Sequence, residues 1–252
     1  MARPCLAVYL ALLYTFCMSI RPVSFAPGEW FHCYNRGVDK RNIFMDEHDA
    51  ERLQMLLYSS NSDTPIHISN LPHAPGQGKA LPYVLEQKRG KPLVDVGAYG
   101  LMPNHLHLLL REINYGGIST FMQKLGTAYS MYFNKKYERV GSLFSGKFKA
   151  RHVTSDAYLR RLVNYIHANA AELFEPRWKK GKVRNMTKLK KELSKYPYSS
   201  FPDFLNAERP HRSILNIVAI EELLSRRPSM ETIMDDACTF YQLEIAGENI
   251  GQ

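Results

Sequence analysis

The first candidates for chemistry are two histidines one residue apart, His105 and His107. They begin a short stretch that ends at Arg111, and the alternation of a β-strand turns all three side chains to one face. The opposite face carries leucines, at Leu106, Leu108 and Leu110. A single histidine is more often a hydrogen-bonded structural residue than a ligand. Two imidazoles at strand spacing, opposite an apolar face, are close enough to hold one cation jointly.

A second segment offers an oxygen ligand and a nucleophile together. Tyr165 and Asn169 are four residues apart, so in a helix they lie one turn apart on the same flank, beside the apolar stripe that contains Leu162 and Ile166. The Asn169 carbonyl would complete a three-ligand set with open positions, which suits Mg²⁺ or Mn²⁺ better than a closed zinc cage. Taken alone, Tyr165 could equally be a packing residue at the edge of the core.

The elements that must position these residues follow from periodicity. Alternating and three-to-four-residue patterns predict strand, helix, strand, strand, helix, strand and helix, at residues 29–36, 46–60, 93–102, 105–112, 118–137, 141–153 and 155–173. Pro103-Asn104 makes the turn of a hairpin between the third and fourth of these elements. This order predicts an α+β fold, a ferredoxin- or RRM-like antiparallel sheet with helices on one face and an open second face.

The chain divides into a core and additions. We expect an apolar run at 1–20, a catalytic domain at 21–178 with an inserted loop at 61–92, and a basic linker with a C-terminal helical module at 179–252. Within the insertion, Tyr83 to Leu85 could form a short strand. Within the C-terminal module we expect helices at 213–226 and 229–243.

The apolar run has three readings. It could be a signal peptide or a short membrane anchor, but a spanning helix needs about 20 apolar residues and Pro27 follows the best cleavage site. We favour a third reading, in which translation begins at Met18. The four cysteines show no paired metal-ligand spacing, so reduced thiols in the cytoplasm fit best.

Charge points to a polyanionic partner. The formal net charge is +9, and residues 134–191 carry 16 Lys and Arg against 4 acidic residues, a balance of +12 that leaves −3 for the rest of the chain. Aromatic residues are mixed with these cations, which suits phosphate contact combined with base stacking. A solvated basic surface explains the charge equally well.

Several motifs give this pattern a family. The stretch Met102-Pro-Asn-His-Leu-His-Leu-Leu-Leu, followed by Tyr165-Ile-His-Ala-Asn169, resembles single-tyrosine HUH-class transposases, particularly the REP-associated tyrosine transposases. The resemblance covers about residues 28–205 and continues through Tyr34-Asn-Arg-Gly, Phe121-Met-Gln-Lys-Leu, Tyr132-Phe-Asn, Gly141-Ser-Leu-Phe and Tyr198-Ser-Ser. The insertion, the C-terminal helices and the apolar run lie outside what it explains.

The resemblance implies roles for the candidate residues. His105, His107 and Asn169 become ligands of Mg²⁺ or Mn²⁺, and Tyr165 becomes the nucleophile that nicks and rejoins single-stranded, hairpin-bearing DNA through a covalent 5′-phosphotyrosine. Many insertion-sequence relatives have glutamine where this chain has Asn169, so the helix must lie closer here to compensate for the shorter side chain. Expected phosphate contacts are Arg36, Lys147, Lys149, Arg151, Arg160 and Arg161.

Other readings remain open at this stage. A non-catalytic module of the same fold could recognise structured DNA or RNA. The protein could act as a monomer or a homodimer, and we expect no membrane partner. A nuclease tethered to a membrane would require the apolar run in the mature protein.

Overall fold

The computed structural model describes residues 23–64, 66, 68, 80–221, 224 and 228–250. The predicted apolar run at 1–20 and the middle of the predicted insertion, residues 69–79, lie outside the described residues. The helices and strands that position the candidate residues all lie within them. Among the described helices, none is both long and apolar enough to cross a bilayer.

An antiparallel sheet of four strands forms the centre of the fold. The strands are β1 (Trp30–Arg36), β2 (Val94–Met102), β3 (His105–Glu112) and β4 (Lys149–His152). Their order in the sheet is β2-β3-β1-β4, and each neighbouring pair is antiparallel. The predicted α+β class, the strand ranges near 29–36, 93–102 and 105–112, and the Pro103-Asn104 hairpin are therefore confirmed. Of the predicted extended stretch 141–153, residues 149–152 form a strand.

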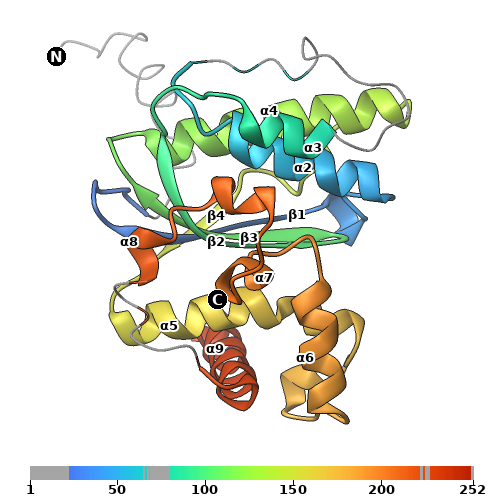
Figure 1. The fold of residues 1–252 in the computed structure, drawn as a ribbon, viewed down its shortest axis with the longest axis vertical. Helices are drawn as coiled ribbons and strands as arrows, with labels where there is room; N and C mark the ends of the chain where they lie inside the picture. Colours follow the sequence, from blue (N-terminus) through green and yellow to red (C-terminus); the bar gives the residue numbers. More distant parts are fainter. Residues whose placement is uncertain are drawn as a thin grey trace, which may run out of the picture.

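One face of the sheet packs against three helices, α2 (Glu47–Ser59), α3 (Ala80–Glu86) and α4 (Gly117–Lys136), which lie together above the sheet in Figure 1. Asp46 caps α2, because its side chain accepts a hydrogen bond from the backbone N–H of Asp49. The core on this side contains Phe31, Leu108 and Phe121 among many buried apolar side chains. The helices predicted at 46–60 and 118–137 are thus confirmed.

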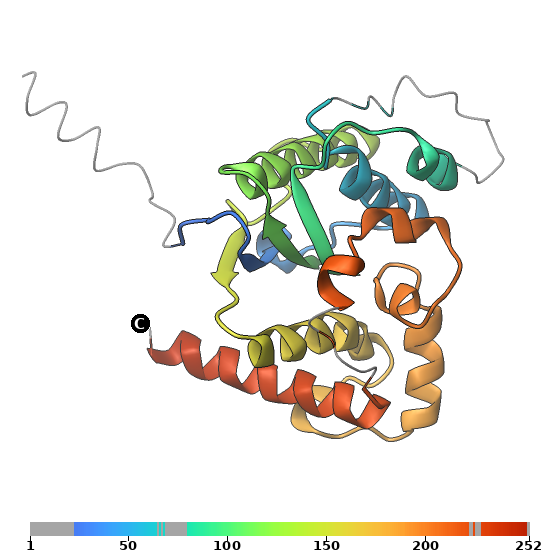
Figure 2. The ribbon, with the colours of Figure 1, turned by 60° about the vertical axis from the view of Figure 1, so that its left-hand side comes forward.

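The second face of the sheet is also covered, so our expectation of an open face is wrong. The helices α5 (Asp156–Ala168), α6 (Met186–Lys195) and α9 (Met230–Ile250) lie on this side, as Figures 1 and 2 show. The physical reason is that this face also carries apolar residues: Trp30, Ala98 and Leu109 are buried together with side chains of α5 and α9. Leaving such a surface in water would forfeit its hydrophobic stabilisation.

Shorter helices complete the chain: η1 (Val38–Lys40), η3 (Asn169–Leu173), η4 (Trp178–Lys180), α7 (Phe201–Phe204), η5 (Pro210–Ile214) and α8 (Val218–Glu221). Two predictions need correction here. The strand expected at 83–85 belongs to helix α3, because Leu81, Val84 and Leu85 have helical spacing and bury one face. The helix expected at 213–226 is replaced by η5 and α8, and α9 is the helix predicted at 229–243, extended to Ile250.

Helix α5 lies unusually close to β2. A Cβ atom at Gly100 would stand 2.8 Å from the backbone oxygen of Ile166, in the last turn of α5. That contact is with backbone, so no side-chain rotation could relieve it. Gly100 is thus a position where the missing side chain allows helix and sheet to approach closely.

Replacing this glycine should therefore destabilise the protein. We expect Gly100→Ala to lower the free energy of unfolding by about 1–3 kcal/mol, the usual cost of overpacking a core. The matched control is Gly126→Ala in α4, where an added Cβ meets nothing within 4 Å; there the alanine should raise stability by about 0.5–1 kcal/mol. Urea unfolding of both variants measures the difference, and equal effects would contradict the close approach.

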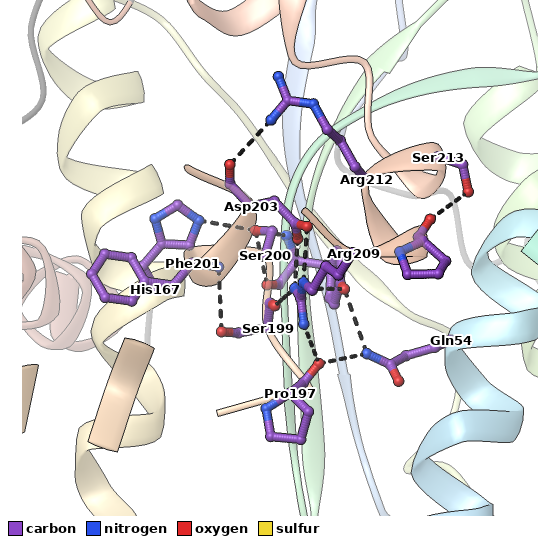
Figure 3. Close-up of polar contacts among 12 residues, drawn as sticks. Gln54, His167, Pro197, Ser199, Ser200, Phe201, Asp203, Arg209, Arg212 and Ser213 are labelled. Atoms are coloured by element: carbon purple, nitrogen blue, oxygen red, sulfur yellow. Dashed lines mark hydrogen bonds and ion pairs between the residues drawn. The ribbon is translucent and has the colours of Figure 1, made fainter. Parts of the chain in front are cut away.

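The outer edge of β2 is covered by the segment after α6. The N–H of Leu101 donates to the Tyr198 carbonyl at 2.9 Å, and the N–H of Ser200 donates to the Tyr99 carbonyl at 2.9 Å. Arg209 holds this segment in place, because its guanidinium donates to Asp203 and to the Pro197 carbonyl, as Figure 3 shows. Asp203 is fully buried, so its carboxylate depends on this partner.

We expect Arg209→Met to lower the free energy of unfolding by about 3–5 kcal/mol, because it leaves the Asp203 carboxylate buried and uncompensated. The control is Arg41→Met, which breaks an ion pair of 3.9 Å with Asp39 whose side chains are 40% and 82% exposed. That change should stay within about 0.5 kcal/mol of wild type. Thermal unfolding of the two variants makes the comparison, and the double variant Arg209→Met/Asp203→Leu should recover part of the stability. If Arg209→Met loses no more stability than the control, the buried Arg209–Asp203 pair does not have this role.

Candidate active site

The two strand histidines share one face of the sheet, as the alternation predicts. His105 lies opposite Arg36 of β1 and His107 lies opposite Tyr34. On the far side of β3, Gly100 is the partner of His107. The face that α5 covers therefore presents both imidazoles at the end of the strands, with an aromatic and a basic residue beside them.

Two amide oxygens flank the His105 ring. Its Nδ1 lies 2.6 Å from Oδ1 of Asn104, and its Nε2 lies 2.9 Å from Oδ1 of Asn169. Burial lowers the pKa of His105, and the contact with Asn169 opposes that effect without reversing it. A neutral imidazole carries a single N–H, so it can donate to one oxygen only. One of the two ring nitrogens therefore faces an amide oxygen without donating to it.

A third histidine supports His107 from the neighbouring strand. His32 Nε2 lies 2.9 Å from His107 Nδ1, and the two rings stack with centroids 5.1 Å apart. Burial lowers the pKa of His32 to about 3, with a smaller contribution from the charge of Arg151. The pKa of His107 is likewise held well below its usual value, first by burial and then by the neighbouring His105 and His32. All three rings are thus neutral near pH 7.

Tyr165 from α5 lies next to this histidine cluster. Its ring centroid is 5.3 Å from that of His107, with the two planes nearly perpendicular. Phe240 of α9 packs on the other side with a centroid separation of 4.7 Å, so Tyr165 is 8% exposed. Burial raises the pKa of the phenol, and the carboxylate of Glu244 raises it further.

Asn169 lies one turn beyond Tyr165, at the junction of α5 and η3. The side chain is buried, and its Nδ2 atom has no hydrogen-bond partner among the described residues. The amide lies close enough to the Tyr165 hydroxyl to lower the pKa of that phenol, against the larger effect of burial. The Asn169 side chain therefore contacts His105 and lies beside Tyr165.

These donor atoms could hold a divalent cation. In the described part of the chain, no group of three His, Cys, Asp or Glu side chains could hold a metal, so a site built on His105 and His107 would need another type of ligand. His105 Nε2 and Asn169 Oδ1 are 2.9 Å apart. Two adjacent ligands at ~2.1 Å from an octahedral Mg²⁺ lie about 3.0 Å apart. The distance between these two atoms therefore suits a cation that both would hold, with His107 as the third ligand.

The pocket over these residues has a volume of about 440 Å³ and a basic rim. Arg36, Lys147 and Lys149 line it together with the histidines and Tyr165. Glu244 also lines the pocket, and it forms an ion pair of 2.7 Å with Arg151. A polyanion entering here meets three cations on the rim and one carboxylate that is already neutralised.

The structure brings most of the sequence-predicted site residues together. His105, His107, Tyr165 and Asn169 meet at one place, and Arg36, Lys147, Lys149 and Arg151 surround it. The other two expected phosphate contacts lie elsewhere on α5. Arg160 lines a different cavity between α5, α7 and α9, and Arg161 donates to the Ala157 carbonyl of its own helix.

Sequence analysis missed two contributions to the site. His32 had a readable signal, because Trp30, His32 and Tyr34 alternate with the apolar Phe31 and Cys33 in a strand. The α9 residues Phe240, Tyr241 and Glu244 also line the pocket. No local pattern marks them, since their position depends on how α9 packs along α5, side by side in Figure 2.

The neutral histidine cluster predicts a distinct pH response. Because the folded pKa of His32 is about 3, the unfolded chain binds the proton first, and stability is lost as the pH falls from about 6.5 toward about 3. Imidazole ¹⁵N NMR of the metal-free protein at pH 5 should show His32 and His107 neutral, with His107 protonated on Nδ1. The single variants His32→Asn and His107→Asn assign the signals. An imidazolium pattern at pH 5, or a proton on Nε2 of His107, would contradict the arrangement.

Comparison with known proteins gives a family match over part of the chain. Residues 78–169 match the family model for IS200-like transposases, and this segment contains His105, His107, Tyr165 and Asn169. Among solved structures, a REP-associated tyrosine transposase bound to a REP hairpin matches with 14% identity and a TM-score of 0.43, over 75% of this chain and 86% of that chain. A search of curated proteins gives no match.

Proposed function

We propose that the protein nicks and rejoins single-stranded DNA through a covalent tyrosine–DNA intermediate, starting from the match of residues 78–169 to the IS200-like transposase model. The substrate we propose carries a hairpin next to the cleaved bond. The nucleophile is Tyr165, and the residues that would hold a divalent cation, Mg²⁺ or Mn²⁺, are His105, His107 and Asn169.

One observation carries this proposal. A tyrosine from α5 lies beside two neutral histidines from β3, and the asparagine one turn further along α5 has its oxygen 2.9 Å from one of them. A packing tyrosine needs no such neighbours. A binding module has no need of a nucleophile, two ligand histidines and an amide in a single pocket, so the arrangement favours catalysis.

In the proposed reaction, the Tyr165 oxygen attacks the phosphorus of a phosphodiester. The bond from tyrosine oxygen to phosphorus forms, and the bond from phosphorus to the 3′ oxygen breaks. The phenol gives its proton to solvent water, and the departing 3′ oxygen takes one up as a hydroxyl. The product is a 5′-phosphotyrosine, which a 3′ hydroxyl of the same or another strand can attack to restore a phosphodiester without ATP.

The bound cation would supply Lewis acidity at a non-bridging phosphate oxygen. The protein residues supply orientation. Asn104 and His32 hold the two imidazoles with Nε2 available, and the close approach of α5 at Gly100 brings Tyr165 and Asn169 to them. Because burial raises the pKa of Tyr165, the phenol stays protonated in the free protein at neutral pH, and deprotonation belongs to the complex with DNA.

The surroundings suit a single strand of DNA. Arg36, Lys147 and Lys149 on the pocket rim would contact phosphates, which makes the affinity fall with salt. Arg151 becomes available to phosphate only when its ion pair with Glu244 opens. In this proposal the protein acts in the cytoplasm, as a monomer or a homodimer, with DNA as its partner.

The test is formation of a covalent adduct. Purified protein is incubated with a 5′-labelled or 3′-labelled hairpin oligonucleotide from the DNA that flanks its own gene, with Mg²⁺ or Mn²⁺, and resolved on a denaturing gel. We expect a labelled protein band whose label follows the 5′-phosphate side of the cut. Tyr165→Phe should remove this band completely while binding to the hairpin changes less than twofold.

Two controls sharpen this experiment. Tyr158→Phe, seven residues earlier on α5, should keep the adduct, and EDTA should abolish it until the metal is restored. If the band persists in Tyr165→Phe, the assigned nucleophile is wrong. If wild-type protein binds the hairpin but never forms the band, the protein is a binding module and the catalytic proposal fails.

A further inference from the structure

A second and larger cavity lies on the α4 side of the sheet, next to the active site. Its volume is about 720 Å³, within the range of about 300–1,000 Å³ that small-molecule sites occupy. One wall is helix α4, and the other is the loop that leads into β4. We refer to this cavity, between α4 and residues 142–148, as the α4 groove.

Four of the sequence motifs meet in this groove. Phe121-Met-Gln-Lys-Leu contributes Met122, Gln123 and Leu125 to its lining. Three more motifs supply Asn134 from Tyr132-Phe-Asn, Ser142, Leu143 and Phe144 from Gly141-Ser-Leu-Phe, and Asn35 from Tyr34-Asn-Arg-Gly. Three segments between residues 121 and 144 thus meet the end of β1 at a cavity that the proposed nucleophile and metal ligands do not line.

The two walls differ in chemistry. On α4, one flank carries small or polar side chains at positions that share a face, Ser119, Gln123, Gly126, Thr127 and Ser130. Gln123 and Thr127 are exposed, and Gly126 leaves open space where a side chain could stand. The floor and opposite wall are apolar and aromatic, with Leu106, Phe144 and Phe148.

The groove adjoins the active-site pocket at the ends of two strands. Asn35, Leu106 and Lys147 line both cavities. Asn35 and Leu106 are paired residues at the ends of β1 and β3, one position away from Arg36 and His105. Lys147 therefore marks the shortest route along the surface from one cavity to the other.

We propose that the α4 groove binds unpaired nucleobases of the DNA strand adjacent to the phosphate that Tyr165 attacks. Aromatic and apolar walls accept the faces of bases, and the amide and hydroxyl groups of Gln123 and Thr127 read their edges. Bases in a duplex are stacked and paired, so the occupant is single-stranded. Lys147, at the junction, contacts the phosphate between the two cavities. This inference rests on the proposed function and adds to it where the strand runs and where its sequence is read.

The first test fills the groove. Gly126→Leu adds a side chain at a point where nothing lies within 4 Å of a Cβ, so the fold should accept it. The matched control is Thr120→Leu, which places the same side chain on an exposed position of α4 outside the groove lining. The probe is a labelled hairpin oligonucleotide with five-nucleotide single-stranded arms, compared with the same hairpin without arms.

We expect wild-type protein to bind the hairpin with arms more tightly than the hairpin without them. Gly126→Leu should lower the affinity for the hairpin with arms at least tenfold, which is the amount that one or two stacked bases contribute. Thr120→Leu should keep the gain within twofold. A pool of hairpins with randomised arms should yield preferred bases at one or two arm positions with wild-type protein, and Gln123→Ala should relax the preference at one of them.

The second test needs no variant. Arms that carry 5-iododeoxyuridine at single positions are irradiated in complex with wild-type protein, and the cross-linked peptides are identified by mass spectrometry. Cross-links to peptides within 119–134 or 142–148 support the inference. Cross-links from every arm position to other peptides alone overturn it.

The outcomes separate the two proposals. If Tyr165 forms the adduct while Gly126→Leu binds the armed hairpin like wild type, the α4 groove is not the base site and the proposed chemistry stands. If wild-type protein forms no adduct, the proposed function fails. If, in addition, the arms do not increase the affinity of wild-type protein, the inference about the α4 groove fails as well.

Discussion

The arrangement of the site depends on one short distance, the approach of α5 to β2 at Gly100. The helix supplies both Tyr165 and Asn169, and the sheet supplies the histidines, so the site exists only if the two layers meet at a fixed separation. A Cβ atom at Gly100 would stand 2.8 Å from the Ile166 carbonyl, which leaves no room for any other residue type. His167, on the same turn of α5, adds a hydrogen-bond contact of 2.9 Å with Ser200, the residue that pairs with β2. This contact limits the rotation of α5 about its axis, and Gly100 sets how close α5 lies to β2.

Burial gives the site its electrostatic character. The histidines lose their charge because water is excluded from them, and the phenol keeps its proton for the same reason. Neutral imidazoles are good metal ligands, whereas a protonated phenol is a poor nucleophile. In the proposed reaction, the same dry environment would prepare the histidines to bind a cation and would keep the phenol protonated until DNA is bound. Phe240 and Glu244, from α9, contribute to this on the side of the tyrosine.

Periodicity predicted the sheet, its hairpin and the helices that follow strands, because these depend on contacts between residues close in sequence. It also placed His105 and His107 on one face, and Tyr165 and Asn169 on one flank. The sequence did not predict that the second face is covered. Trp30 and Leu109 share that face with the histidines, but two apolar residues beside polar ones do not show whether a helix packs on them. Phe240 of α9 is 75 residues from Tyr165 in the sequence. No local pattern can predict a contact between residues so far apart.

The hydrogen bonds of Tyr198 and Ser200 to β2 also bear on how copies of this protein can associate. A sheet grows by adding strands to unpaired edges, and such edges are where self-association and aggregation begin. At the β2 edge, the segment with Tyr198 and Ser200 forms these hydrogen bonds, and the buried ion pair of Arg209 with Asp203 holds that segment in place. The opposite edge is β4, with four residues that include Lys149 and Arg151. Arg151 is compensated by Glu244, so the charge left at this edge is that of Lys149. The sheet is thus limited in edge-to-edge growth on one side by its own chain, and on the other by a strand of four residues that carries a lysine.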